Sequence, residues 1–262
     1  MREFNENQIS KLIIESYYRK LTDRIVNDVL IVGAGPAGMT AGRLLAQDGF
    51  KVTIIERHLA PGGGIWGGGM GMNEVVIQEA ALPLIQAVNL RHQKREGGLY
   101  TVDSVELAAG LCFHALQAGV EIINLMTLED VSVHDDRVTG IVINRTGISG
   151  RLHVDPLTFS AKAVIDATGH DAMVLNKIRQ RGFFRDTPIE TAKEGPMNAA
   201  EGEDFVVNRS GEVYPGLWVT GMSVCAAYGG PRMGPIFGGM LLSGQRVAAL
   251  IAEELRKQEI TR

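Results

Sequence analysis

The apolar and polar positions near the start of the chain predict a helix followed by a strand–helix–strand unit. Apolar residues recur at helical spacing over residues 7–21, which indicates an amphipathic helix that packs on its own domain or on a neighbouring subunit. The run "VLIV" is continuously apolar, as in a strand that is buried on both faces of a sheet. A helical segment and a second strand, "KVTIIE", follow it, so we expect two parallel strands joined by a helix.

The rest of the chain continues with short strands and closes on a long helix. We predict strands in "RVTGIVINR", "AKAVIDATG" and "GLWVTGM", and a helix from about residue 238 to residue 257. No repeat, low-complexity tract or linker rich in proline and serine marks a boundary. We therefore predict a single dinucleotide-binding domain over residues 1–262. Its α/β fold would be flavoprotein-like and Rossmann-type, with three layers, a mostly parallel central sheet and a smaller antiparallel β element.

Composition excludes several classes of function. The 262 residues carry a formal net charge of −4 and no long basic block, which argues against a nucleic-acid partner. No apolar stretch approaches the length of a membrane span, and the N-terminus has no signal-peptide core, so we expect no membrane partner. Cys112 and Cys225 form neither a CxxC motif nor a disulfide pattern, which favours a reducing cytoplasm.

The first strand runs directly into a glycine motif, "GAGPAG", at the predicted start of a helix. Gly33 would allow the tight turn, Gly35 the approach of a pyrophosphate, and Gly38 the close packing of helix on strand. Glu56 ends the second strand, where a carboxylate accepts hydrogen bonds from ribose hydroxyls and disfavours a 2′-phosphate. The pattern predicts an adenine dinucleotide, and by itself it does not separate NAD from FAD.

Two further glycine-rich segments follow. In "APGGGIWGGGMGM", Trp66 and the methionines indicate that the loop packs on something apolar, against the alternative of a flexible loop. In "YGGPRMGPIFGGM", Arg232 stands between glycines, where a guanidinium can hold a carboxylate or a phosphate with two hydrogen bonds. A solvated surface arginine is the alternative for this position.

Together with "HVDPL" and "DATGHDA", these segments resemble the thiamine thiazole synthase family over nearly the whole chain. The resemblance implies a flavoprotein-like fold that uses NAD as a substrate. It implies conversion of NAD, glycine and a sulfur source into an ADP-linked thiazole carboxylate, the precursor of the thiazole half of thiamine.

The sulfur source separates two branches of that family. Fungal and plant members give up the sulfur of one of their own cysteines and therefore work once. The matching position in this chain, two residues before Asp155, is His153. The chain thus resembles the archaeal and anaerobe-type branch, which implies a true catalyst that takes free sulfide.

The same resemblance implies an iron(II) site. Family members bind the metal through an aspartate and a histidine at the positions of Asp155 and His170. Carboxylate and imidazole suit Fe(II), and two protein ligands leave positions open for substrates. His153 and Asp155 are two residues apart, so on an extended segment both would point to one face. Without the family motifs, ordinary surface polar groups are the alternative for these three residues.

The remaining roles are carried over by resemblance. Arg232 would hold the glycine carboxylate, while Asp166 and Asp171 stay open between support and catalysis. The family also implies a homo-oligomer, an octamer, with sites near subunit contacts. The residues implied to line the NAD site and its reacting end are Ala37, Glu56, Arg57, Gly64, Val131, His153, Val154, Asp155 and Met222.

Three other functions compete with this hypothesis. A flavin-dependent oxidoreductase would share the N-terminal motif and the C-terminal strand, turn and helix, and would purify yellow. A non-catalytic NAD-binding protein would bind NAD without turnover. A sugar-phosphate isomerase would have no evident use for the dinucleotide motif.

Overall fold

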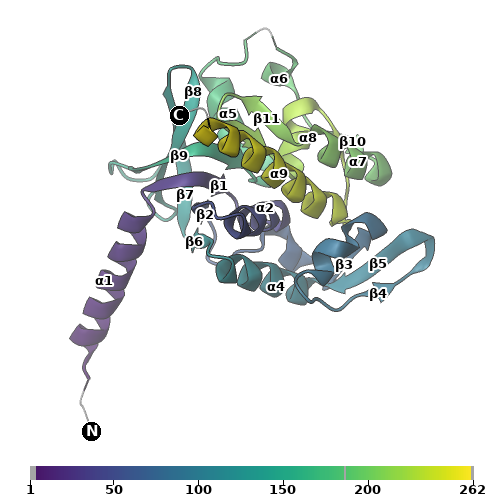
Figure 1. The fold of residues 1–262 in the computed structure, drawn as a ribbon, viewed down its shortest axis with the longest axis horizontal. Coiled ribbons are helices and arrows are strands. Elements are labelled where there is room, and N and C mark those ends of the chain that lie inside the picture. Colours follow the sequence, from purple (N-terminus) through teal and green to yellow (C-terminus); the bar gives the residue numbers. More distant parts are fainter. Residues whose placement is uncertain (1–3, 186, 261–262) are drawn as a thin grey trace.

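The computed structural model describes residues 4–185 and 187–260. Within these residues, an eight-stranded sheet forms the centre (Figure 1). Strands β12, β9, β1, β2 and β6 are parallel neighbours, β11 pairs antiparallel with β12, and the antiparallel β7–β8 hairpin joins β9. The strands are β1 (Val26–Val32), β2 (Val52–Ile55), β6 (Glu121–Ile123), β7 (Met126–His134), β8 (Arg137–Arg145), β9 (Leu157–Asp166), β11 (Gly211–Tyr214) and β12 (Leu217–Val219).

Two small sheets lie outside the central one. The first is antiparallel, with the order β3–β5–β4, and the second is a parallel pair, β10 and β13. Their bounds are β3 (Glu74–Gln78), β4 (Gln93–Lys94), β5 (Leu99–Asp103), β10 (Gly195–Met197) and β13 (Pro231–Arg232). The mainly parallel sheet and the smaller antiparallel element confirm the predicted fold class.

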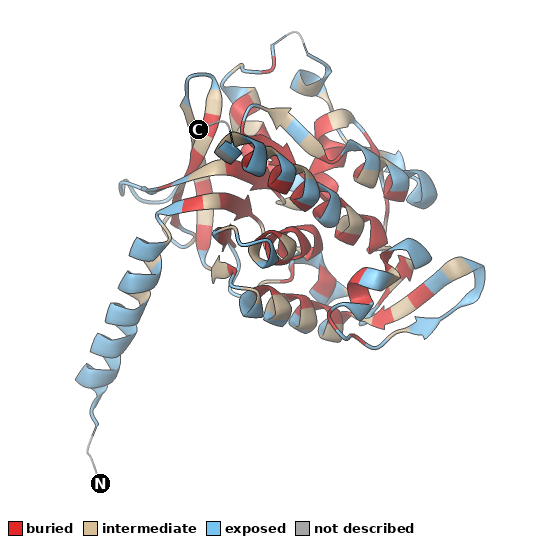
Figure 2. Cartoon of the chain, viewed as in Figure 1, coloured by how far each residue is buried: buried red, intermediate tan, exposed pale blue. Residues whose placement is uncertain are grey.

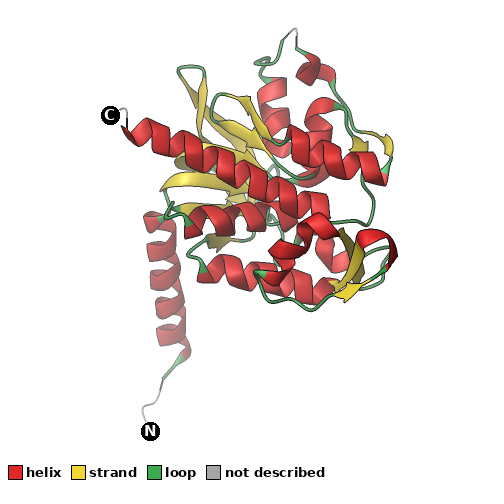
Figure 3. Cartoon of the chain, turned by 45° about the vertical axis from the view of Figure 1, so that its right-hand side comes forward, coloured by secondary structure: helices red, strands yellow, loops and turns green. Residues whose placement is uncertain are grey.

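Helices cover both faces of the central sheet (Figure 3). The helices of the described residues are α1 (Glu6–Asp23), α2 (Pro36–Gln47), α3 (Leu82–Gln86), α4 (Ser104–Gln117), α5 (Met173–Gln180), α6 (Pro188–Thr191), α7 (Ala199–Arg209), α8 (Met222–Tyr228) and α9 (Gly238–Ile260), of which α1 covers neither face. The predicted strands in 137–145, 161–169 and 216–222 correspond to β8, β9 and β12, and the predicted closing helix is α9.

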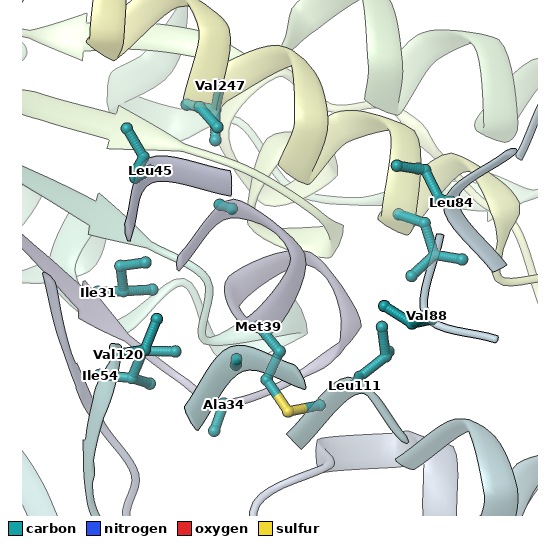
Figure 4. Packing of buried hydrophobic residues seen from close by; sticks show 14 of the residues in the cluster. Ile31, Ala34, Met39, Leu45, Ile54, Leu84, Val88, Leu111, Val120 and Val247 are labelled. Carbon is teal, nitrogen blue, oxygen red and sulfur yellow. The ribbon is translucent and has the colours of Figure 1, made fainter. Parts of the chain in front are cut away.

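Alternate residues of β1 enter two different cores. Val29 and Ile31 belong to the cluster formed with α2, α4 and α9, whereas Leu30 and Val32 belong to the cluster formed with β7, β8, α5 and α8. Figure 4 shows the first cluster, in which Ile31 lies between Leu45 of α2 and Ile54 of β2. A strand that is buried on both faces reads as a continuous apolar run, which is why "VLIV" was recognisable in the sequence.

Helix α1 projects away from the rest of the chain (Figures 1 and 2). Its N-terminus is closed by a capping box between Asn5 and Gln8, and the helix has no buried residue. Leu12, Ile13 and Ile14 are each more than 60% exposed. The helix was predicted correctly. Of the two expected packing partners, its own domain does not cover the apolar side chains, and packing on a neighbouring subunit stays a prediction. Among the described helices, none has the length and apolar character that a membrane span requires.

Candidate functional site

A cavity of about 670 Å³ lies at the carboxyl ends of the parallel strands. This volume is within the range of small-molecule sites, roughly 300–1,000 Å³, and the ends of parallel strands are where open α/β sheets bind ligands. Most residues implied for the dinucleotide site line it. These are Gly33, Gly35, Ala37, Glu56, Arg57, Gly64 and Met222. The predicted glycine ligand Arg232 and the predicted metal ligand His170 line the cavity as well.

The glycine turn after β1 forms one wall of the cavity. Gly33 has φ +104°, and an added Cβ would lie 2.4 Å from the carbonyl oxygen of Ala167. An added Cβ on Gly38 would lie 2.2 Å from the carbonyl oxygen of Gly33, so this glycine serves packing behind the turn. Gly35 has no atom within 4 Å of such a Cβ and lines the cavity. Pro36 then begins α2, whose unpaired N–H groups are suited to an anion.

Glu56 connects the end of β2 to this turn. Its Oε2 accepts a hydrogen bond from the Ala34 N–H at 2.9 Å, and its Oε1 accepts from the His58 N–H at 2.8 Å. Only 4% of the residue is exposed, yet it lines the cavity. A carboxylate has about four lone-pair sites, which leaves room for a ribose hydroxyl. Glu56 therefore shapes the turn as well as offering an acceptor to a ligand.

The turn after β9 forms the adjoining wall. Asp166 is fully buried and accepts hydrogen bonds from the backbone N–H groups of Thr168 and Leu175 and from the hydroxyl of Ser223. Burial raises the pKa of Asp166, and these hydrogen bonds oppose that rise. Asp166 is thus a support that organises the turn carrying His170.

His170 and Asp171 project from that turn to the cavity wall. The Nδ1 atom of His170 lies 2.7 Å from Oε1 of Glu194 and 2.9 Å from Oε2. Asp171 pairs with Arg57 at 2.9 Å, so this carboxylate connects the two walls. Among the described residues, Nε2 of His170 has no hydrogen-bond partner, which leaves one imidazole nitrogen available to a ligand.

The two other glycine-rich segments complete the cavity. Gly63 approaches the Cα of Gly35 so closely that an added Cβ would lie 3.2 Å from it, which brings two loops into backbone contact. Arg232 lies in β13 and lines the far side. Trp66 and Met72 are 44% and 65% exposed, and Met70, which also lines the cavity, is 82% exposed. Ile65 of the same loop is buried in the first core, so packing of Trp66 and the methionines on something apolar stays a prediction.

The segment around the second predicted metal ligand lies elsewhere. His153, Val154 and Asp155 are exposed in irregular chain before β9, and none of them lines the cavity. Val131, implied near the adenine, lies on β7 and also is not a lining residue. Within residues 4–185 and 187–260, no group of three or more His, Cys, Asp or Glu side chains gathers that could hold a metal. One chain therefore brings His170 to the cavity without Asp155.

Both cysteines are free thiols that are poorly suited to nucleophilic chemistry. Burial raises the pKa of Cys225 to about 12, and the nearby Glu194 adds to the rise. Burial also raises the pKa of Cys112. Because the thiolate is the reactive form, these side chains stay protonated and inert at neutral pH.

Some cavity residues carried no signal in the sequence. Met126, Thr127 and Leu128 of β7 contribute to the wall, as does His58 beside Glu56. The β7 residues lie in an ordinary strand, so no motif could have identified them. His58 follows Glu56 by two residues, but only the structure shows that its Nδ1 lies 3.0 Å from Oε1 of that carboxylate.

The chain was compared with known proteins. The model of the Thi4 family matches residues 10–237. A thiamine thiazole synthase of Thermotoga maritima is 48% identical over 250 residues, covering 95% of this chain and 97% of the relative. A thiamine thiazole synthase of Pyrococcus abyssi is 50% identical over 251 residues, covering 95% and 98% of the two chains.

A solved structure agrees with these relatives. The crystal structure of Thermovibrio ammonificans THI4 superposes with a TM-score of 0.93 at 40% sequence identity. The superposition covers 97% of this chain and 100% of that one. The similarity thus extends over the sheet, the cavity and the closing helix together.

Two glycine substitutions separate ligand binding from folding. We predict that Gly35→Ala leaves the free energy of unfolding within about 0.5 kcal/mol of the parent, because the added methyl meets no atom and φ is −81°. It should weaken NAD binding at least about tenfold by blocking the phosphate approach. Gly38→Ala should instead destabilise the fold by more than about 2 kcal/mol. Urea unfolding measures the stability of the two variants, and calorimetric titration measures their affinity for NAD. Equal NAD affinity of Gly35→Ala and the parent would contradict a role of Gly35 in phosphate binding.

Proposed function

The chain belongs to the Thi4 family, and from that premise we propose that it is a thiamine thiazole synthase. It joins NAD, glycine and sulfide into an ADP-linked thiazole carboxylate and releases nicotinamide. The observation that carries this proposal is a single cavity lined by a dinucleotide turn, an imidazole and a guanidinium. These groups are suited to bind the pyrophosphate of NAD, a metal ion and the carboxylate of glycine in one place.

NAD is the proposed substrate of the glycine turn. The N–H groups at Gly35 and Ala37 offer hydrogen bonds to the pyrophosphate, and Ala37 can contribute only through its backbone. Glu56 and Arg57 also line the cavity and are proposed to contact the ribose of the ADP half of NAD. Arg232, on the far wall, is suited to the carboxylate of glycine because a guanidinium binds a carboxylate with two parallel hydrogen bonds.

Sulfur is proposed to come from solution. His153 occupies the position at which sacrificial relatives carry a donor cysteine, and an imidazole holds no sulfur to give. Cys225, buried with a pKa of about 12, and Cys112 are unsuited to the donor role. The protein would then be a catalyst that takes free sulfide. Its two free thiols are consistent with the reducing environment of the cytoplasm.

His170 fits a metal ligand by the chemistry of its donors. Nδ1 is engaged by Glu194, and Nε2 is available at the cavity wall. Imidazole and carboxylate together suit Fe(II), which would supply Lewis-acid chemistry for the sulfur transfer if it is held at this wall. We propose His170 and Asp155 as the protein ligands, with Asp155 brought in by another subunit.

A homo-oligomer, an octamer by the pattern of the family, would complete the site. Leu152, Val154 and Leu157 flank Asp155 and are 47–60% exposed, which is unusual for three apolar side chains on one short segment. The apolar face of α1 is likewise uncovered in one chain. Both surfaces are suited to a second copy, and docking of residues 149–157 against a neighbouring cavity would carry His153, Val154 and Asp155 to its substrates.

The proposed reaction is tested by counting turnovers. With Fe(II), sulfide, NAD and glycine in the absence of oxygen, the thiazole product should exceed the enzyme on a molar basis while the intact protein mass stays constant. No protein atom is consumed when His153 replaces the donor cysteine. Product measured by liquid chromatography that stops at one equivalent, with loss of H₂S from the protein, would contradict the proposal.

Assembly of the site from two subunits is tested by mixing inactive variants. Asp155→Ala and His170→Ala should each abolish product formation and still bind NAD, whose ADP half lies on the glycine turn. Random mixed oligomers should recover activity in about a quarter of their sites, where an intact cavity meets an intact neighbouring loop. Mixed oligomers, verified by two affinity tags, that remain inactive would refute the shared site.

A further inference from the structure

His170 is held by a carboxylate from a distant part of the chain. Both oxygens of Glu194 lie within 2.9 Å of Nδ1, and the two residues are 24 positions apart. An ionised carboxylate can only accept hydrogen bonds, so Nδ1 carries the proton and the lone pair of Nε2 is left for a ligand. We propose that Glu194 is a positioning residue that fixes the tautomer and the ring orientation of His170 for metal binding, an inference that rests on the proposed function.

The surroundings make this carboxylate a fixed partner. The side chain of Glu194 is 18% exposed, whereas that of His170 is 58% exposed. The less exposed group therefore anchors the more exposed one. The neighbouring Asp171 also carries a carboxylate, but this carboxylate pairs with Arg57. Of these two carboxylates, only that of Glu194 is hydrogen-bonded to the ring of His170.

A small sheet connects Glu194 to the opposite wall of the cavity. Glu194 immediately precedes β10, which pairs in parallel with β13. The N–H of Gly195 donates to the carbonyl oxygen of Gly230 at 2.8 Å. The N–H of Asn198 donates to the carbonyl oxygen of Arg232 at 3.0 Å. The residue that orients His170 and the residue proposed to hold glycine are thus joined through one pair of strands. Their separation is set by backbone hydrogen bonds.

Histidine ligands of metals usually donate their second N–H to such a partner, whose loss costs about 10–100-fold in metal affinity. Glu194→Ala should bind Co(II) about 10–100-fold more weakly than the parent, as measured by competition with a chelator. Glu194→Gln keeps an oxygen that accepts from Nδ1–H, so it should lose less than Glu194→Ala. Glu129→Gln, on β7 and outside the cavity lining, removes one acidic charge as a control and should bind Co(II) like the parent.

A second readout needs no metal. Long-range ¹H–¹⁵N spectra of the metal-free protein report the tautomer of His170, identified by the signal that is absent in His170→Ala. The parent and Glu194→Gln should show Nδ1–H, and Glu194→Ala should lose that preference. An unchanged tautomer in Glu194→Ala, or Co(II) affinity within twofold of the parent, would overturn the positioning role. His170→Ala binding Co(II) like the parent would overturn the proposed metal site itself, and with it this inference.

Discussion

The parallel pairing of β1 with β9 is the constraint on which the site depends. In the register of this pair, Val32 is opposite Asp166, so both strands end at the same edge of the sheet and the turns that follow them lie side by side. The turns touch so closely that Gly33 has no room for a Cβ beside Ala167. Any side chain there would push apart the two walls of the cavity. Backbone contact between the turns therefore sets the distance from the dinucleotide motif to His170.

Buried polar groups then give each turn a single conformation. Glu56 accepts hydrogen bonds from the turn after β1, and Asp166 accepts them from the turn after β9. Both carboxylates are almost completely inaccessible to solvent, and their partners offset the cost of removing them from water. Glu194 is more exposed and holds a side chain, that of His170, at the cavity wall. Three carboxylates thus support groups that are proposed to contact ligands.

Local patterns in the sequence predicted the parts of the molecule that local forces determine. The apolar run of β1, the glycine turn and α9 follow from burial and backbone sterics, and each lies where it was expected. Glu194 could not be found in this way, because its contact with His170 depends on β13, a strand of two residues with no periodic signal. The exposed position of Asp155 also depends on surroundings that one chain does not contain.

The central claim is that this cavity holds NAD-derived material and not a flavin. The direct test is mass spectrometry of the small molecules released from protein that has been purified without oxygen. The account predicts an ADP-linked thiazole carboxylate, or NAD, near one molecule per chain. FAD at that stoichiometry, with the absorbance of a bound flavin, would contradict the account and favour an oxidoreductase built on the same fold.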